Sequence, residues 1–213
     1  MDIDFSAITE HQRYKLMASL IVPRPIALIT TLSEDGVVNA APFSMFNMLG
    51  EEPPIVMVSI NRLQDGQLKH TAANIVRTGE FVVHLTDEAM AAQMHRCGER
   101  FPIDVSELAA VGLTTAPSNR VQPPRIVESP AAFECTLYEL LETPSRQIFI
   151  GQVHWLHARE GLIDTALWRV RLQNYFPVAR FGASFYINTR ERFSLEKPGE
   201  QGRPTLSTSI DEI

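Results

Sequence analysis

A short polar and basic run, SINRLQDGQLKHTAAN, has the residue types of a phosphate-binding site. It begins with Ser59, Asn61 and Arg62, directly after a strand-like apolar stretch. Lys69 and Thr71 follow where a helix is expected to begin. The first turn of a helix leaves backbone N–H groups unpaired and carries partial positive charge, so it attracts anions. On these residues alone, an ordinary solvated loop before a capped helix is an equal alternative.

A second stretch, VVNAAPFSMFN, mixes amide and hydroxyl side chains with aromatic ones. It contains Asn39, Pro42, Phe43, Ser44 and Phe46. A fully buried core would not need the polar groups, and a surface loop would not need the aromatic rings. Ligand pockets combine mostly apolar walls with a few polar groups that fix orientation. The mixture therefore predicts the wall of a ligand pocket.

Other site chemistries have weaker support in the sequence. No G-x-G-x-x-G, G-x-x-x-x-G-K or G-x-S-x-G motif occurs, so the usual signatures of dinucleotide folds, P-loops and α/β-hydrolases are absent. The pairs His95/Cys97 and His154/His157 have spacings that invite a metal hypothesis. However, a strand turns His154 and His157 to opposite faces, and no further cluster completes a four-ligand set. We therefore expect no metal site and assign no catalytic residue.

Composition narrows the possible partners and location. The 213 residues include 19 Lys and Arg against 25 Asp and Glu, a formal net charge of -6, so nucleic acid is not expected as a partner. The N-terminal MDIDFSAITEHQRYKL lacks the basic start and apolar run of a secretory signal. The longest early apolar run, LMASLIVP, is far shorter than the roughly 20 residues that span a bilayer. With only two cysteines and no disulfide framework, we expect a soluble cytoplasmic protein without membrane contact.

Strand signals outnumber helix signals along the chain. Strands are predicted in IALITTL, VVNAAP, PPIVMVSI, FVVHL, AAFECTLYELLE and RQIFIGQVHWLHARE. Hairpin turns are expected at Asp35–Gly36 and near TPSR, and a bend is expected at Gly151. Short hairpin connections favour an antiparallel barrel over a doubly wound sheet. We predict one domain, residues 1–190, and an extended C-terminal arm, residues 191–213.

The predicted helices are few and short. One is expected in EHQRYKLMASLI after Thr9, one in LKHTAANIVRTGEF with Gly79 as its C-cap, and one in DEAMAAQMH. Asp104 and Glu107 have the spacing of a capping box, which predicts a further helix start. The proline-rich segment 114–130 is predicted to be a long extended connection.

Four blocks of sequence, in this order, resemble the flavin reductase-like, FMN-binding split-barrel family. They are RPIALITTLSEDGVVNAAPFSMFN, PPIVMVSI, KHTAANIVRTGEFVVHL and PVARFGASFY, and together they span most of the chain, from about Pro23 to Tyr186. The pattern N-x-A-P-F-S-x-F is the most characteristic. The resemblance implies a mainly β fold: an antiparallel Greek-key split barrel with short flanking helices. It also implies FMN as cofactor, with FAD as an alternative, and a homodimer with the flavin near the subunit interface.

The resemblance further implies roles for the two polar stretches. NAAPFSMF would lie along the flavin ring, and the run from Ser59 to Asn74 would hold the ribityl chain and phosphate. The implied cofactor-binding residues are Arg24, Thr30, Asn39, Ala40, Ala41, Pro42, Phe43, Ser44, Phe46, Ser59, Asn61, Arg62, Lys69, Thr71, Asn74 and Arg180. The chain departs from the family pattern at His70, where relatives often have an acidic residue. It also reads ARFGA around Arg180, where GRxGG is common.

In such a family the flavin carries the chemistry, and the protein supplies position and electrostatics. The resemblance implies a NAD(P)H-dependent flavin reductase, in which NADH or NADPH passes a hydride to FMN and a partner monooxygenase uses the reduced flavin. His154 or His157 would line the nicotinamide side. The alternative is a protein that retains FMN, either for electron transfer or to reduce another small organic substrate. A barrel that has lost flavin and serves as an interaction module is a third hypothesis, which the intact polar set disfavours.

Overall fold

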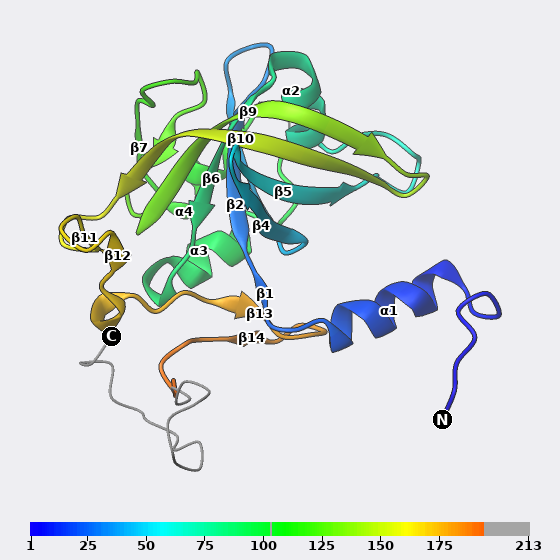
Figure 1. The fold of residues 1–213 in the computed structure, drawn as a ribbon. Helices are drawn as coiled ribbons and strands as arrows, with labels where there is room; N and C mark the ends of the chain where they lie inside the picture. Colours follow the sequence, from blue (N-terminus) through cyan, green and yellow to red (C-terminus); the bar gives the residue numbers. More distant parts are fainter. Residues whose placement is uncertain (103, 194–213) are drawn as a thin grey trace, which may run out of the picture.

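A seven-stranded antiparallel sheet forms the centre of the computed structural model, which describes residues 1–102 and 104–193 (Figure 1). Its strands are β2 (Ala27–Leu32), β3 (Val38–Phe43), β4 (Phe46–Glu51), β5 (Pro54–Asn61), β6 (Glu80–Leu85), β9 (Ala131–Glu142) and β10 (Arg146–Ala158). Their order across the sheet is β3-β2-β6-β9-β10-β5-β4.

The two edge strands, β3 and β4, follow one another in the chain with only Ser44 and Met45 between them. So short a link spans about 11 Å at most, whereas strands in a flat sheet are separated by about 4.8 Å each. The sheet must therefore curl until its two edges meet. The backbone N–H of Ser59 on β5 donates to the carbonyl of Met45 at this seam (2.8 Å). The mainly β split-barrel prediction is confirmed.

Strand β2 is buried on both faces. Successive side chains of a strand point to opposite sides, and Ile29 packs in the inner core with Phe81 and Phe149. Leu28 packs on the other side, in a second core that includes Met94. Because water reaches neither face, β2 gives its neighbour β3 a rigid support.

The predicted hairpins and the predicted bend are present. Strands β2 and β3 pair around the Asp35–Gly36 turn, and β9 and β10 pair around the TPSR turn. The register of β10 against β9 shifts between Ile150 and Gly151. A Cβ at Gly151 would lie 2.3 Å from Cζ of Phe81, so the core leaves room only for glycine at the bend.

Helices α1 (Glu10–Leu20) and α2 (His70–Thr78) begin and end where the sequence signals stand. Thr9 caps α1 in a capping box with Gln12. Gly79 ends α2 in the left-handed region, with φ of 70°. In Figure 1, α1 reaches out from the barrel, whereas α2 lies against it.

The segment after β6 contains the 3₁₀ turn η1 (Glu88–Met90), α3 (Ala91–Arg96) and α4 (Glu107–Val111). The predicted helix near Glu107 exists, but the predicted capping box with Asp104 is wrong, because Ser106 is the N-cap and no side-chain cap forms. The Glu107 carboxylate instead accepts the backbone N–H of Ala40 (2.8 Å).

The proline-rich segment 114–130 is not simply extended. It folds back so that β7 (Thr115–Ala116) pairs with β8 (Arg125–Ile126). Glu134 on β9, whose side chain is fully buried, accepts the backbone N–H of Asn119 (2.7 Å) and that of Arg120, which fixes the segment to the barrel. Prolines prevented a long ladder but still allowed this short pairing.

Short strands complete the described chain. Strands β1 (Arg24–Pro25), β13 (Ala179–Arg180) and β14 (Tyr186–Ile187) form a three-stranded sheet in the order β1-β13-β14. A hairpin of β11 (Ile163–Asp164) and β12 (Arg169–Val170) precedes the turn η2 (Leu172–Asn174). Of the predicted arm, residues 194–213 lie outside the described residues.

Candidate functional site

A cleft of about 590 Å³ opens beside the β3–β4 seam. This volume falls in the range of roughly 300–1,000 Å³ that small-molecule pockets occupy. One wall is formed by Pro42, Phe43 and Ser44, where β3 ends. The remaining lining residues are Tyr14, Lys15, Ala18 and Ser19 on α1; Arg24 and Ile26; Met94, His95, Gly98 and Glu99; and Arg180, Ala183 and Tyr186. The cleft thus gathers the predicted residues Arg24, Pro42, Phe43, Ser44 and Arg180.

Two cations flank the cleft beside Phe43 and Tyr14. Lys69, the N-cap of α2, places Nζ 5.8 Å from the centroid of the Phe43 ring. Arg146, at the start of β10, donates to the carbonyl of Ser59 (3.4 Å) and lies 5.7 Å from the Tyr14 ring centroid. Burial, and secondly the charge of Arg146, lower the pKa of Lys69. Among the described residues neither cation has an ion-pair partner, so an anion placed between them would be stabilised.

A second pair of cations lines the cleft itself. Arg24 and Arg180 are directly opposite each other in the β1–β13 pair. Nη1 of Arg24 donates to the carbonyls of Ala18 and Ile21, the latter at 2.9 Å, and so holds the C-terminal end of α1. Arg24 is only 8% exposed, yet its Nε is buried without a hydrogen-bond partner. Burial lowers the pKa of Arg24, and the charge of Arg180 lowers it further.

Arg180 is oriented by aromatic and backbone contacts. Its guanidinium lies 4.7 Å from the Tyr186 ring centroid, and the Tyr186 hydroxyl is 2.9 Å from Nδ1 of His95. Nη2 of Arg180 donates to the carbonyl of Ala183 (2.6 Å). Ala183 has φ of 38°, in a region that favours glycine.

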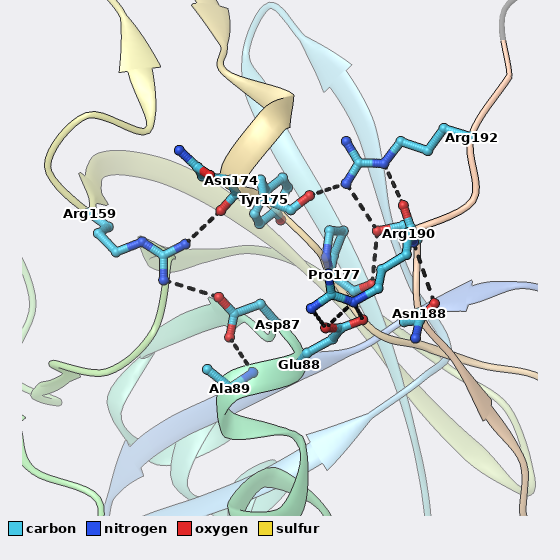
Figure 2. A network of polar contacts seen from close by, with 11 residues as sticks. Asp87, Glu88, Ala89, Arg159, Asn174, Tyr175, Pro177, Asn188, Arg190 and Arg192 are labelled. Carbon is cyan, nitrogen blue, oxygen red and sulfur yellow. Dashed lines mark hydrogen bonds and ion pairs between the residues drawn. The ribbon is translucent and has the colours of Figure 1, made fainter. Parts of the chain in front are cut away.

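The C-terminal segment that carries Arg180 is attached to the end of β6 by a polar network (Figure 2). Arg159 joins the buried carboxylate of Asp87 (3.1 Å) to the carbonyl of Asn174 (3.1 Å). The backbone N–H of Val178 donates to the carbonyl of Thr86 (3.0 Å). These contacts fix where β13 begins, and therefore where Arg180 lies.

The predicted residues Asn39, Thr71 and Asn74 lie together but satisfy one another. The Asn39 amide donates to Oγ1 of Thr71 (2.9 Å) and of Thr31 (3.3 Å), and the Asn74 amide donates to Oγ1 of Thr31 (3.0 Å). All are buried. The network locks α2 onto β2 and β3, and in doing so it positions Lys69.

Other predicted residues have structural contacts and do not line the cleft. Thr30 donates to the carbonyl of Pro124 (2.7 Å). Phe46 is in the inner core, with Ala41 packed against it, and Ala40 is in the second core.

Asn61 is the last residue of β5, and Arg62 follows it. The Asn61 amide donates to the carbonyl of Arg62 (3.0 Å), and Arg62 forms an ion pair with Glu142 (2.9 Å). The histidines expected on the nicotinamide side are also absent from the cleft lining. His154 contacts Thr136 (2.7 Å), and His157 contacts Glu134.

Four residues of the site were missed at the sequence level: Tyr14, His95, Arg146 and Tyr186. Arg146 reaches the site because β10 pairs with β5, where its partner is Asn61. The hairpin signal pairs β10 only with β9, so it gives no indication of this second neighbour. Tyr14 falls in the helix expected after Thr9, and the helix signal alone does not indicate that this residue lines the cleft.

The chain matches the model of the flavin reductase like domain over residues 17–175. It is 36% identical to the uncharacterized protein YwrF of Bacillus subtilis over 191 residues, 87% of this chain and 93% of YwrF. Two solved structures are similar over nearly the whole chain. One is Pseudomonas fluorescens 2-nitrobenzoate 2-nitroreductase NbaA, at 36% identity and a TM-score of 0.85, covering 95% of this chain and 98% of that one. The other is nitrilotriacetate monooxygenase component B from Bacillus cereus, at 32% identity and a TM-score of 0.86, covering 92% and 98%.

The chain therefore belongs to the flavin reductase-like family, and the resemblance seen in the sequence is confirmed. Its class is that of the flavin-binding split-barrel oxidoreductases. The cleft residues fit such a cofactor: an apolar wall with polar edges at Pro42–Ser44 adjoins the Lys69–Arg146 cations, which lack a carboxylate partner in the described chain. In the described part of the chain, no helix is both long and apolar enough to cross a membrane.

Proposed function

We propose that this protein binds FMN in the cleft and acts as a NAD(P)H-dependent flavin reductase. The observation that carries the proposal is the continuity of the cleft wall with a cation pair. Phe43 belongs to the wall formed by Pro42–Ser44 and also contacts Lys69, whose charged neighbour is Arg146. A flat ring system with a phosphate tail needs an apolar wall for the ring and, next to it, positive charge for the phosphate.

The protein residues would bind and orient the cofactor. Pro42 and Phe43 would exclude water from one face of the ring, and polar groups around Ser44 would meet its edge. Lys69 and Arg146 would hold the phosphate, with the α2 N-terminus adding backbone N–H donors. The bound flavin would supply the chemistry, accepting a hydride from NADH or NADPH and passing its two electrons on. The Lys69–Arg146 pair, taken as the phosphate site, suits the monophosphate of FMN, and FAD is the alternative cofactor.

Two acceptors for the electrons have support from similar proteins. The likeness to nitrilotriacetate monooxygenase component B supports a partner monooxygenase that receives reduced flavin. The likeness to a 2-nitrobenzoate 2-nitroreductase supports the alternative, a protein that retains FMN and reduces a small organic molecule in the cleft.

A homodimer working in the cytoplasm is part of the proposal. Apolar side chains are exposed on α1 (Met17, 49%; Leu20, 77%) and on the edge strand β4 (Met48, 61%; Leu49, 52%). Such surfaces usually mark interfaces, and edge strands are usually covered. Sedimentation velocity should give a dimer, and a monomer at all concentrations would contradict this part of the proposal.

The experiment that tests the function is an absorbance spectrum of the protein titrated with FMN, repeated without oxygen after adding NADH or NADPH. We expect a bound flavin band that bleaches with at least one donor. A cytochrome c assay of the ultrafiltrate then separates released flavin from retained flavin, and 2-nitrobenzoate tests reduction in place. A protein that binds neither FMN nor FAD would refute the proposal.

A further inference from the structure

We propose that Arg24 and Arg180 form a second anion-binding subsite, which takes the carboxylate or phosphate group of the molecule that exchanges electrons with the flavin. The role of that molecule rests on the proposed function. The existence of an anion site rests on the cleft alone.

The first argument is the position of the two arginines. They are Cα partners in the antiparallel β1–β13 pair, where side chains project from adjacent backbone positions. Like charges directly opposite each other destabilise a pair of strands. No ion pair to either arginine is present in the described part of the chain, although Glu99 also lines the cleft. An arrangement that costs stability without a counter-ion is typical of a site completed by a ligand.

The second argument is an unsatisfied donor. Nη1 of Arg24 is used on the carbonyls that end α1, but Nε is buried and has no hydrogen-bond partner. Buried polar groups nearly always have a partner, and an unpaired one is costly. A guanidinium fork is suited to carboxylate and phosphate oxygens, so an oxyanion would satisfy this donor and neutralise the pair together.

The third argument is preorganisation. The ring of Tyr186 and the carbonyl of Ala183 hold Arg180 in place, and His95 in turn holds the Tyr186 hydroxyl. Lys15 adds a further positive charge to the lining, from α1. A fixed guanidinium loses less side-chain freedom when it binds an anion than a mobile one does.

This subsite is distinct from the proposed phosphate site. The Arg24–Arg180 pair comes from β1 and β13, whereas Lys69 and Arg146 come from the N-cap of α2 and the start of β10. The charge of Arg180 lowers the pKa of Arg24, after burial, and the charge of Arg146 does so for Lys69. Arg24 and Lys69 therefore each have the other member of their own pair as the like-charged neighbour, which separates two cation pairs.

Calorimetric titration of FMN-saturated protein tests the subsite with defined probes. Benzoate represents an organic carboxylate, inorganic pyrophosphate represents the linkage of a nicotinamide dinucleotide, and benzamide is the uncharged control. We expect at least one anion to bind the wild-type protein, and Arg180→Gln to weaken it by about tenfold or more while leaving benzamide unchanged. Preference for benzoate would identify an organic acid as the ligand, and preference for pyrophosphate would identify the dinucleotide.

Matched variants keep the test decisive. Arg171→Gln removes an exposed arginine that pairs with Asp164 (3.5 Å), and its affinity for each anion should equal that of the wild type. Arg24→Lys retains the charge but lacks the Nε donor. This variant should also bind the anion more weakly, while it still folds. The proposal is overturned if neither anion binds the wild type, or if Arg180→Gln binds the anion as tightly as the wild type. It is also overturned if Arg180→Gln lowers the affinity for FMN instead of the affinity for the anion. Failure of FMN binding would refute the proposed function, and the same titrations on the flavin-free protein would still decide the subsite.

Discussion

Two groups of arginines differ in what their guanidinium groups contact. One group attaches the C-terminal segment to the end of β6, in the polar network that we call the fastening network, and the other group surrounds the cleft. In the fastening network of Figure 2, Arg159 pairs with Asp87 and Arg190 pairs with Glu88 at 2.6 Å. Arg192 donates to the carbonyls of Leu172 (2.6 Å) and Tyr175. Around the cleft, Arg24, Arg146 and Arg180 have carbonyl or aromatic contacts but no carboxylate among the described residues.

This difference distinguishes cations that stabilise the fold from cations that are available to bind a ligand. A guanidinium with its donors satisfied inside the protein gains little from a ligand, because the ligand would have to displace existing partners. A cation that is partly desolvated and lacks a counter-ion gains the full interaction with an incoming anion. Stability should therefore depend on the fastening network, and ligand affinity on the cleft.

The largest expected effect is on flavin affinity. Replacing Lys69 and Arg146 together with Met should weaken FMN binding by about 4 kcal/mol, roughly a thousandfold, because two charge-assisted phosphate contacts are lost. Folding stability should be unchanged or slightly higher, since the variant removes a like-charged pair. Quenching of flavin fluorescence measures the affinity, and urea unfolding measures the stability.

Arg159→Met is the matched control from the fastening network. It leaves the buried Asp87 carboxylate without its cation and should lower the urea midpoint, while FMN affinity in the folded protein stays within about twofold of wild type. If both variants lower the affinity equally, the distinction between the two regions is wrong.

A buried histidine between β6 and the β7–β8 segment, on the outer side of the sheet, extends the comparison to pH. His84 is fully buried, with Nδ1 2.9 Å from the Leu28 carbonyl and Nε2 accepting the backbone N–H of Ile126 (2.8 Å). These partners suit the neutral ring, and burial lowers the pKa of His84 to about 4. Because the folded value lies below the unfolded value of about 6.5, the stabilisation is complete above that pH and is lost as the pH falls toward 4.

The expected loss is roughly 3 kcal/mol of unfolding free energy between about pH 7 and pH 4. His84→Gln retains a donor and an acceptor but does not titrate, so the difference between wild type and variant should shrink over this interval. Urea unfolding at several pH values measures it. A constant difference would mean that His84 does not titrate with folding.

Much of the fold could be predicted because local signals agreed with it. Apolar runs bounded by turns gave the long strands, and the Thr9 and Gly79 caps gave two helix ends. The capping box at Asp104 failed because the Glu107 carboxylate bonds to Ala40, which is far away in sequence. Short pairings such as β7 with β8 depend on tertiary contacts that residue types do not specify.

The candidate site was predictable only where residue type was sufficient. The apolar and hydroxyl residues of Pro42–Ser44 carried their own signal and do line the cleft. Asn39 and Thr71 have the same polar character, but they bond to each other, and sequence cannot distinguish a donor that waits for a ligand from one already paired. Strand register, which brings Arg146 beside Ser59, is equally invisible without the fold.

The smallest expected effect is that of replacing Arg62, an arginine that already has a carboxylate partner. The sequence resemblance assigned Arg62 to the phosphate, but the structure pairs it with Glu142, whose side chain is 54% exposed. Exposed ion pairs contribute about 0–1 kcal/mol, so Arg62→Ala should change stability by less than that and FMN affinity by no more than about twofold. Arg146→Ala, titrated with FMN alongside it, should lose affinity by more than about tenfold. If the two variants lose FMN affinity equally, an unpaired cation does not mark the ligand site at this end of the β5–β10 pair, where Arg146 is opposite Asn61 and Arg62 follows it in the chain.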